Sequence, residues 1–226
     1  MKTELHYYPG NANLAAHILL EEAGCDYELV LVDRAQRAQK SAEYLRLNPN
    51  GTIPTLVCGP LVLFETAAIC LHIADTHPAA RLAPPLGSSE RAHLYKWLFF
   101  LSNTVQPAYM AFRYPEQHVA LEGTPGGLDG TAVVDAVRTA AAQRAARAFE
   151  VIERAWGDAA PFLLGEQYSA CDAYLYMLAW WARKLPQPPA RLPRIRACVA
   201  AVAARAATKR ACESEGVDVY DPTLDA

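Results

Sequence analysis

The sequence predicts an α/β domain over residues 1–77 and an all-helical domain over residues 89–226. Three observations support this fold class. Strand and helix patterns alternate in the first region, as in a sheet covered by helices. Residues 78–88 form a segment rich in proline, with glycine and serine, which is typical of a linker. After residue 89 the apolar residues recur only at helical spacing.

The chain begins with a strand–helix–strand pattern. Residues Thr3 to Tyr7 alternate polar and apolar side chains, which predicts a short strand. Asn13 to Ala23 has apolar residues at helical spacing, and Gly24 follows as a stop signal. Tyr27 to Val32 is apolar on both faces, which predicts a buried parallel strand. Together these segments form a βαβ unit.

The rest of the first region predicts two more strands and two helices. A short helix is expected near Ser41 to Leu47. Thr55 to Val57 and Leu61 to Phe64 read as strands of a hairpin that turns at Cys58-Gly59-Pro60. Thr66 to Asp75 follows as an apolar helix. The full order is compatible with a four-stranded mixed sheet with helices packed against it.

The second region predicts helices throughout. Long helices are expected over Ser89–Ala111 and Thr131–Trp156, with a glycine- and proline-containing loop between them and two or three shorter helices from Cys171 to Cys212. Their apolar stripes are the predicted core: Leu94, Trp97, Leu98, Leu101, Val105 and Ala108 on the first helix, and Ala145, Phe149, Ile152 and Trp156 on the second. Ser169 and Asp172 have the spacing of a capping box, which predicts a helix start and no chemistry.

Composition argues against nucleic-acid and membrane partners. The 226 residues carry 21 basic and 24 acidic side chains, and 52% are hydrophobic. No basic stripe is present, and we interpret Arg138, Arg144, Arg147 and Arg154 as the solvated face of a helix. No apolar run is long enough for a membrane span, and the first residues lack the apolar stretch of a signal peptide. We expect a cytoplasmic protein.

The six cysteines are scattered, without a CxxC pair or a Cys/His cluster at ligand spacing. We expect them to be reduced and mostly buried, and we expect no metal site.

Two segments resemble a known family across nearly the whole chain. NPNGTIPTL…LVLFETAAICLHIAD is similar to the glutathione-binding block of cytosolic glutathione transferases, and FLLGEQYSACDAYLYML resembles a helix start in their second domain. The resemblance implies a thioredoxin-like first domain, glutathione as co-substrate, and a two-fold homodimer. The layout is nearest to the bacterial beta class.

The resemblance assigns glutathione binding to two short motifs. Thr52, Ile53 and Pro54 would form a turn with a cis proline, which leaves the main chain of Ile53 free to pair with the cysteinyl backbone of the tripeptide. Glu65 and Thr66 begin an apolar helix, where they would hold the ammonium and carboxylate of the γ-glutamyl end. The structural alternatives are a proline that only starts a strand and a threonine that only caps a helix.

Lys40 resembles the basic residue that meets the glycyl carboxylate of glutathione, and Arg37 is the alternative. A solvated loop lysine remains the other interpretation.

The sequence departs from the family where the thiol should be activated. Ala12 stands where the beta class has its cysteine, which excludes mixed-disulfide chemistry from that position and argues against a glutaredoxin-like activity. The substitutes, in order, are Asn11, Asn13 and Tyr7. An asparagine N–H beside a helix N-terminus can donate to a thiolate. The alternatives are a helix N-cap for asparagine and a place in the strand core for Tyr7.

The predicted function is conjugation of glutathione to small apolar electrophiles. The candidate pocket consists of Tyr8, Phe99, Asn103, Tyr109 and Phe112, although aromatic residues at such positions often belong to the core. The same site would also suit a glutathione-dependent lyase, dehalogenase or peroxidase. A non-catalytic glutathione-binding or regulatory protein is the alternative that Ala12 favours.

Overall fold

A four-stranded mixed sheet forms the first part of the molecule. The computed structural model describes residues 2–119, 130–157 and 160–223. Strands β1 (Thr3–Tyr7), β2 (Glu28–Leu31), β3 (Thr55–Cys58) and β4 (Leu61–Phe64) lie in the order β2-β1-β3-β4. β1 runs parallel to β2 and antiparallel to β3, and β3 and β4 form the predicted hairpin. The predicted sheet is confirmed.

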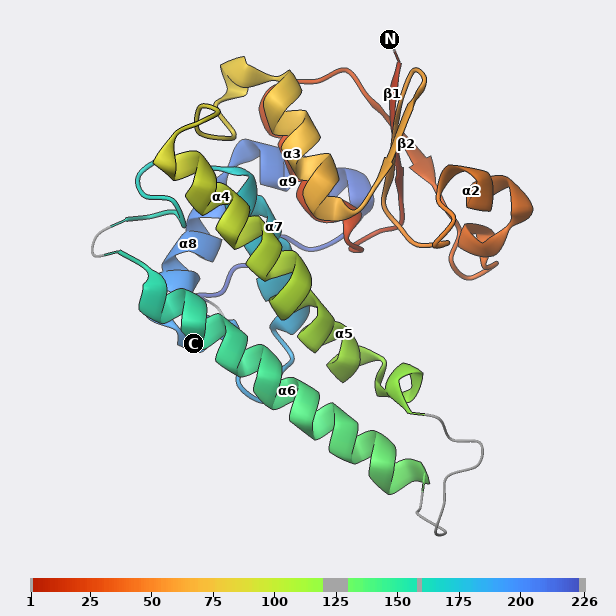
Figure 1. Ribbon diagram of the computed structural model, residues 1–226, viewed down its shortest axis with the longest axis vertical. Helices are drawn as coiled ribbons and strands as arrows, with labels where there is room; N and C mark the ends of the chain where they lie inside the picture. The colour runs from red at the N-terminus through yellow and green to blue at the C-terminus, as the bar shows by residue number, and fades with distance from the viewer. Residues whose placement is uncertain (1, 120–129, 158–159, 224–226) are drawn as a thin grey trace.

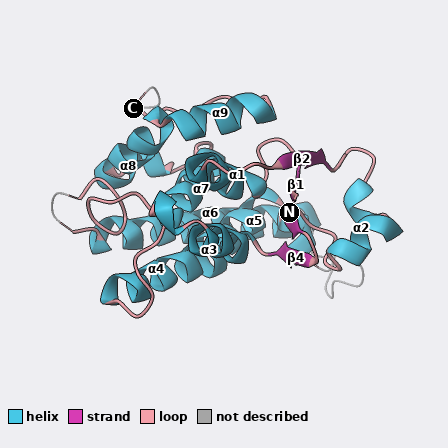
Figure 2. Ribbon diagram, turned by 90° about the horizontal axis from the view of Figure 1, so that it is seen from above, coloured by secondary structure: helices cyan, strands magenta, loops and turns pink. Residues whose placement is uncertain are grey.

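Helices cover both faces of this sheet. α1 (Asn13–Ala23) and α3 (Thr66–Thr76) lie between the sheet and the C-terminal helices, whereas α2 (Ala42–Leu47) lies on the opposite side (Figures 1 and 2). His6 of β1 points toward α2, because its ring centroid lies 5.9 Å from that of Tyr44. The strand alternation therefore turns Leu5 toward α1 and α3, where it is fully buried.

The prediction that the second strand is buried was wrong. β2 is parallel to β1 as expected, but it is an edge strand, and the side chain of Leu31 is 58% exposed. β1 has β3 as its other neighbour, so the outer side of β2 is left without a strand. Of the four residues of β2, only Leu29 packs against the core, and its side chain is partly buried.

In the described residues of the second part of the molecule, the regular secondary structure is helical, apart from an isolated β-bridge between Phe162 and Gly165. Its helices are α4 (Ser89–Phe100), α5 (Gln106–Arg113), α6 (Gly130–Ala155), α7 (Ala170–Ala182), α8 (Pro193–Ala204) and α9 (Ala206–Glu215). A π-helical turn (Leu101–Val105) joins α4 to α5, and 3₁₀ turns occupy Ala38–Lys40, Pro78–Ala80, Pro115–His118 and Pro189–Arg191. α5 and α6 lie side by side (Figure 1). Both predicted apolar stripes are buried. The four arginines of α6 that we assigned to a solvated helix face are exposed, as expected.

Helix α1 is the most enclosed element of the first domain. It packs on β1 and α3 from its own domain and on α7 and α9 from the helical part. Every residue from Asn13 to Leu20 is buried, which includes the polar Asn13 and His17. The N-terminus of α1 therefore lies where the sheet meets the C-terminal helices.

The turn between β1 and α1 is pressed against α7. Gly10 has a φ of +67°, and a Cβ atom there would lie 2.5 Å from the ring of Trp180. The indole Nε1 of Trp181 donates a hydrogen bond of 2.9 Å to the carbonyl of Gly10. Only glycine satisfies both the left-handed backbone and the close approach of the ring.

The predicted capping box begins α7. The Asp172 carboxylate accepts from the backbone N–H groups of Ser169 and Leu163, both at 2.7 Å, and from the Ser169 hydroxyl at 2.9 Å. Burial raises the pKa of Asp172 to about 6, although these donors act in the opposite direction. Asp172 therefore ties the loop before α7 to the helix start, and its role is structural as predicted.

Within the described ranges no helix is long and apolar enough to span a membrane, and no group of three or more histidine, cysteine or acidic residues is arranged to hold a metal ion.

Replacing Asp172 with alanine should destabilise the protein. The substitution removes the carboxylate on which the Leu163 and Ser169 N–H groups converge and leaves them buried without an acceptor. We expect a loss of about 2–4 kcal/mol in unfolding free energy, measured by urea denaturation. Asp135→Ala, at an exposed position of α6, is the control and should change stability by less than about 0.5 kcal/mol. Equal stability of the two variants would contradict this assignment.

Replacing Gly10 with alanine should destabilise the protein more than the same change at Gly24. Both glycines have a positive φ, +67° and +63°, so both variants carry the backbone cost of about 1 kcal/mol. Only at Gly10 would the new methyl group also meet the Trp180 ring, because nothing lies within 4 Å at Gly24. We expect a lower melting temperature and altered tryptophan fluorescence for Gly10→Ala alone. Matching melting temperatures would show that the Gly10–Trp180 contact is not tight.

Candidate functional site

The turn that leads into α1 has a fixed backbone. The Asn11 N–H donates to the Tyr8 carbonyl at 3.1 Å, and the Tyr8 N–H donates to the side-chain oxygen of Asn13 at 3.2 Å. The Leu14 N–H donates to the Asn11 carbonyl at 3.1 Å, which starts the helix. These three hydrogen bonds hold the backbone of residues 8–14 in one conformation.

Of the two candidate asparagines, Asn11 is the one that stays accessible. Its side chain is half-buried, and its Nδ2 donates one hydrogen bond of 3.2 Å to the Pro9 carbonyl. Arg34, which sequence reasoning did not identify, donates at 2.7 Å to the Asn11 Oδ1. An amide nitrogen carries two hydrogens, so one Asn11 N–H remains available to a ligand.

Ala12 contributes its backbone at the position of the missing cysteine. It is the N-cap of α1, and its amide N–H has no partner within the described part of the chain. The N–H groups of a helix start carry partial positive charge and attract anions. Alanine at this position therefore offers no thiol or hydroxyl, but its backbone N–H remains as a donor.

Asn13 and Tyr7 are placed less favourably for contact with a thiol. The Asn13 side chain is fully buried, and its amide is engaged at both ends, by Tyr8 and by Glu215. We therefore assign Asn13 to holding the turn. Tyr7 ends β1, is half-buried, and lies on the same face of the strand as the core residue Leu5.

The Ile53-Pro54 motif has the geometry that the resemblance implies. The peptide bond between these residues is cis. The carbonyl of Thr52 accepts from the Tyr44 hydroxyl at 2.8 Å and from the Asn48 amide at 2.9 Å, which fixes the turn. The backbone N–H and carbonyl of Ile53 make no hydrogen bond to any residue that the structure describes. They are free to pair with an extended peptide.

The start of α3 adjoins the start of α1. The Thr66 hydroxyl donates to the Ala12 carbonyl at 3.3 Å, which is long for a hydroxyl donor. Glu65 is exposed and has a φ of +73°, a conformation that costs a non-glycine residue of the order of 1–3 kcal/mol. Such strain is concentrated at functional sites. The Thr66–Ala12 hydrogen bond thus joins the N-termini of α1 and α3, and Glu65 is exposed beside them.

Lys40 lies beside the loop that precedes Ile53, and Arg37 lies at the start of the 3₁₀ turn that contains Lys40. Both are exposed, and the Lys40 ammonium donates to the Asn50 carbonyl at 2.9 Å. The Lys40 side chain packs on Gly51, where a Cβ would come within 2.7 Å of its nitrogen. Arg37 precedes the 3₁₀ turn with a φ of +55°.

The five aromatic and polar residues of the predicted pocket do not line a single cavity. Tyr109 stacks on Trp181 at 5.5 Å, and Phe112 lies 6.2 Å from Tyr109, so these two approach the Gly10 turn that follows Tyr8. Asn103 instead lines a separate cavity of about 480 Å³ together with Pro107, Arg144 and Arg147. Phe99 is 58% exposed on α4.

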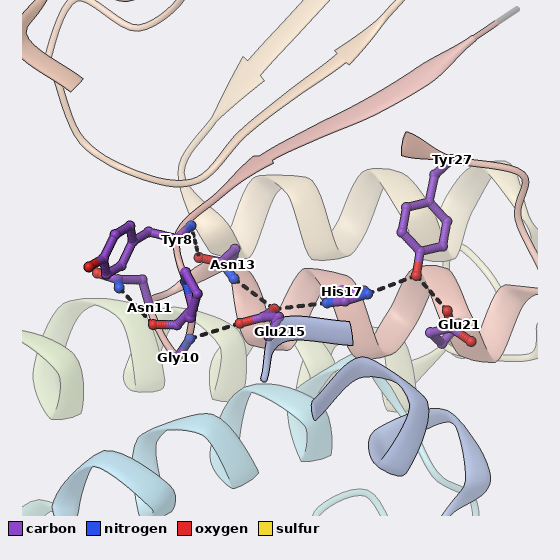
Figure 3. A network of polar contacts seen from close by, with 9 residues as sticks. Tyr8, Gly10, Asn11, Asn13, His17, Glu21, Tyr27 and Glu215 are labelled. Atoms are coloured by element: carbon purple, nitrogen blue, oxygen red, sulfur yellow. Dashed lines mark hydrogen bonds and ion pairs between the residues drawn. The ribbon is translucent and has the colours of Figure 1, made fainter. Parts of the chain in front are cut away.

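A buried polar network that the sequence did not reveal runs along α1 (Figure 3). The Glu215 carboxylate of α9 accepts from Gly10 and Asn13 and contacts the His17 Nδ1, each at 2.8 Å. His17 continues to Tyr27 at 2.7 Å, and the Tyr27 hydroxyl donates to Glu21. No motif signals these pairings, because Glu215 lies 198 to 205 residues away from its partners.

Two titrating groups at the end of this network have shifted pKa values. Burial raises the pKa of Tyr27, and its hydrogen bond to Glu21 adds to the shift. Burial alone would raise the pKa of Glu21, but the hydrogen bonds from Tyr27 and Arg210 outweigh it and lower the value. Glu21 is therefore charged at neutral pH.

Five of the six cysteines are unsuited to supply a thiolate. All six are free, and burial raises the pKa of Cys25, Cys70, Cys171, Cys198 and Cys212, the last to about 11. A thiol with a raised pKa remains protonated and unreactive.

Comparison with known proteins gives a consistent family. Residues 1–75 match the model of the glutathione S-transferase N-terminal domain, and residues 135–209 match that of the glutathione S-transferase C-terminal domain. The chain is 29% identical to glutathione S-transferase GST-4.5 of Xanthomonas campestris pv. campestris, over 95% of this chain and all of the relative. It is 31% identical to glutathione S-transferase 3 of Zea mays, over 85% of this chain and 84% of the relative.

A solved structure agrees with these relatives. A sphingomonad glutathione S-transferase complexed with glutathione superposes with a TM-score of 0.78 at 30% identity, and the match covers 95% of this chain and all of that one. The two chains share the same overall fold. This chain belongs to the glutathione S-transferase family.

Proposed function

We propose that this protein conjugates glutathione to small apolar electrophiles at the surface formed by the N-termini of α1 and α3. The observation that carries the proposal is the unpaired Ile53 main chain beside the strained Glu65 and the Thr66 helix start. A tripeptide can pair with the Ile53 backbone and place its γ-glutamyl end at α3. Thr52, Pro54 and the exposed Lys40 would complete the binding site.

Thr66 would exchange one acceptor for another when glutathione binds. Its hydroxyl has one hydrogen, which points at the Ala12 carbonyl over 3.3 Å. A γ-glutamyl carboxylate would be a stronger acceptor for this hydrogen, because charged partners strengthen hydrogen bonds. Glu65 is exposed beside it and suits the ammonium group.

The sulfur of glutathione would lie at the N-terminus of α1. A free thiol with a pKa of about 8.5 is only a few per cent ionised at neutral pH. Lowering the pKa by about two units requires roughly 2.7 kcal/mol of preferential thiolate stabilisation. The Ala12 N–H and the remaining Asn11 N–H would donate hydrogen bonds to the thiolate, and the dipole of α1 would favour its negative charge. Arg34 orients Asn11.

The apolar electrophile would approach from the side of α5. Trp181 bonds to the Gly10 carbonyl, Tyr109 stacks on Trp181, and Phe112 lies next to Tyr109. Tyr109 and Phe112, together with Tyr8, are therefore the aromatic residues placed for this contact. A two-fold homodimer is part of the proposal, and it is supported by exposed Phe99 on α4 and by Leu61 and Val62 on β4. We also retain a cytoplasmic location as part of it.

A non-catalytic glutathione-binding protein is the second candidate, and Ala12 is the observation that favours it. A glutathione-dependent lyase, dehalogenase or peroxidase would use the same thiolate. The test is retention on immobilised glutathione followed by an assay with a chloronitroaromatic electrophile. Retention and turnover support the transferase, whereas retention without turnover of a panel of electrophiles supports the binding protein. Failure to retain the protein contradicts both.

Replacing Thr66 with valine should weaken glutathione binding without abolishing turnover. The variant keeps the shape of the side chain and removes its hydroxyl. We expect the KM for glutathione to rise about fivefold to twentyfold, with a smaller change in kcat, in steady-state assays. Thr76→Val is the matched control, because the Thr76 hydroxyl lies at the other end of the same helix and bonds to the His72 carbonyl. A KM that is the same in both variants would remove Thr66 from the binding site.

Replacing Asn11 with alanine should lower turnover and leave binding nearly intact. The variant loses an N–H that would donate to the thiolate, and donors aimed at a developing or stabilised anion are worth about tenfold or more in rate. We expect kcat to fall at least about tenfold, while retention on immobilised glutathione is preserved. Unchanged kcat would exclude Asn11 from the mechanism.

A further inference from the structure

Glu215 is the last residue of α9, and its carboxylate is buried against the first turn of the molecule. Its side chain is 0% exposed. One oxygen accepts from the Gly10 N–H, and the other accepts from the Asn13 side-chain amide and faces the His17 Nδ1 (Figure 3). All three contacts lie on the segment that ends β1 and starts α1. The carboxylate thus reaches from the second domain into the turn that carries Asn11 and Ala12.

Hydrogen positions along the chain of contacts follow from the chemistry of each group. Tyr27 has one hydroxyl hydrogen, which it donates to the charged Glu21. The Tyr27 oxygen must therefore accept from the His17 Nε2, which lies 2.7 Å away. On the other side of the ring, the His17 Nδ1 lies 2.8 Å from the Glu215 carboxylate. His17 therefore links Glu215 to Tyr27 and Glu21.

The two carboxylates of this network have different partners. Glu215 contacts His17, and Arg210 of α9 pairs with Glu21 at 2.5 Å. A buried carboxylate is tolerated only where hydrogen-bond donors of the protein replace the water molecules around it. Here these donors are the Gly10 N–H and the Asn13 amide of the turn. Any displacement of the turn would leave the carboxylate short of hydrogen bonds. The Glu215 contacts therefore restrict the turn to one position.

We infer that Glu215 is a positioning residue for thiol activation: its buried carboxylate holds the Gly10 N–H and the Asn13 side chain, so that the Asn11 amide and the Ala12 N–H face the bound sulfur. Glu215 itself touches neither glutathione nor the electrophile. The inference rests on the proposed function, since it assigns a role within that site.

A second contact between the same two helices provides a matched control. Glu22, near the C-terminal end of α1, pairs with Arg205 immediately before α9, at 2.8 Å for one of its two hydrogen bonds. This ion pair also joins the domains, but it lies at the opposite end of α1 from the turn. Glu22→Gln should therefore weaken the α1–α9 contact without freeing Gly10 or Asn13.

The experiment compares Glu215→Gln with Glu22→Gln in the full-length protein. We expect Glu215→Gln to lower kcat about tenfold or more with a chloronitroaromatic substrate, while the KM for glutathione changes less than about threefold. The pH at which bound glutathione is half-ionised, followed by thiolate absorbance, should rise by about one unit, which corresponds to a tenfold loss of thiolate preference. Exchange of the Gly10 amide hydrogen should accelerate in Glu215→Gln alone.

Each result has a defined meaning. Identical pH midpoints, or an unchanged Gly10 exchange rate, in the two variants would overturn the inference. If Glu215→Gln does not fold, Glu215→Asp keeps the charge on a shorter side chain, and its pH midpoint and Gly10 exchange are compared with those of Glu22→Gln in the same way. If the unsubstituted protein shows no thiolate on binding glutathione, the proposed function fails, and Gly10 exchange alone then decides whether Glu215 holds the turn.

Discussion

Helix α1 lies between the sheet and the C-terminal helices, and this enclosure constrains much of the structure around it. A helix buried on several sides cannot leave polar side chains to water, so Asn13 and His17 require partners inside the protein. Glu215 of α9 supplies a carboxylate to both, and through Gly10 it also holds the turn before the helix. A residue of the last helix thereby fixes the conformation of the turn between β1 and α1.

The proposed site combines two helix N-termini with different tasks. α3 begins at Thr66 beside the strained Glu65, and the unpaired Ile53 main chain continues this surface, which suits recognition of a peptide with charged ends. α1 begins beside Ala12 and Asn11, which provide N–H groups. In the proposed site, binding and thiol activation would therefore depend on separate elements. The proposed binding motif does not require a cysteine at position 12.

Local sequence signals were sufficient for most of the secondary structure. The bounds of β1 and α1 agree with the apolar alternation and with Gly24, whose left-handed backbone ends the helix. The Ser169–Asp172 capping box and the buried stripe of α4 and α5 were predicted for the same reason, since each depends on neighbours along the chain. The exposure of β2 was missed, because an apolar strand has the same pattern whether or not another strand joins its outer edge.

By itself, the sequence determined the order of elements, the cis-proline and helix-start motifs of the family, and the absence of a cysteine at position 12. Tertiary structure decided which asparagine stays accessible, because the start of α1 leaves Asn11 half-buried and turns Asn13 inward to Glu215. It also decided the partners of His17 and the approach of Arg34 to Asn11. These contacts join residues that are distant in sequence, and their geometry exists only once α9 has packed against α1.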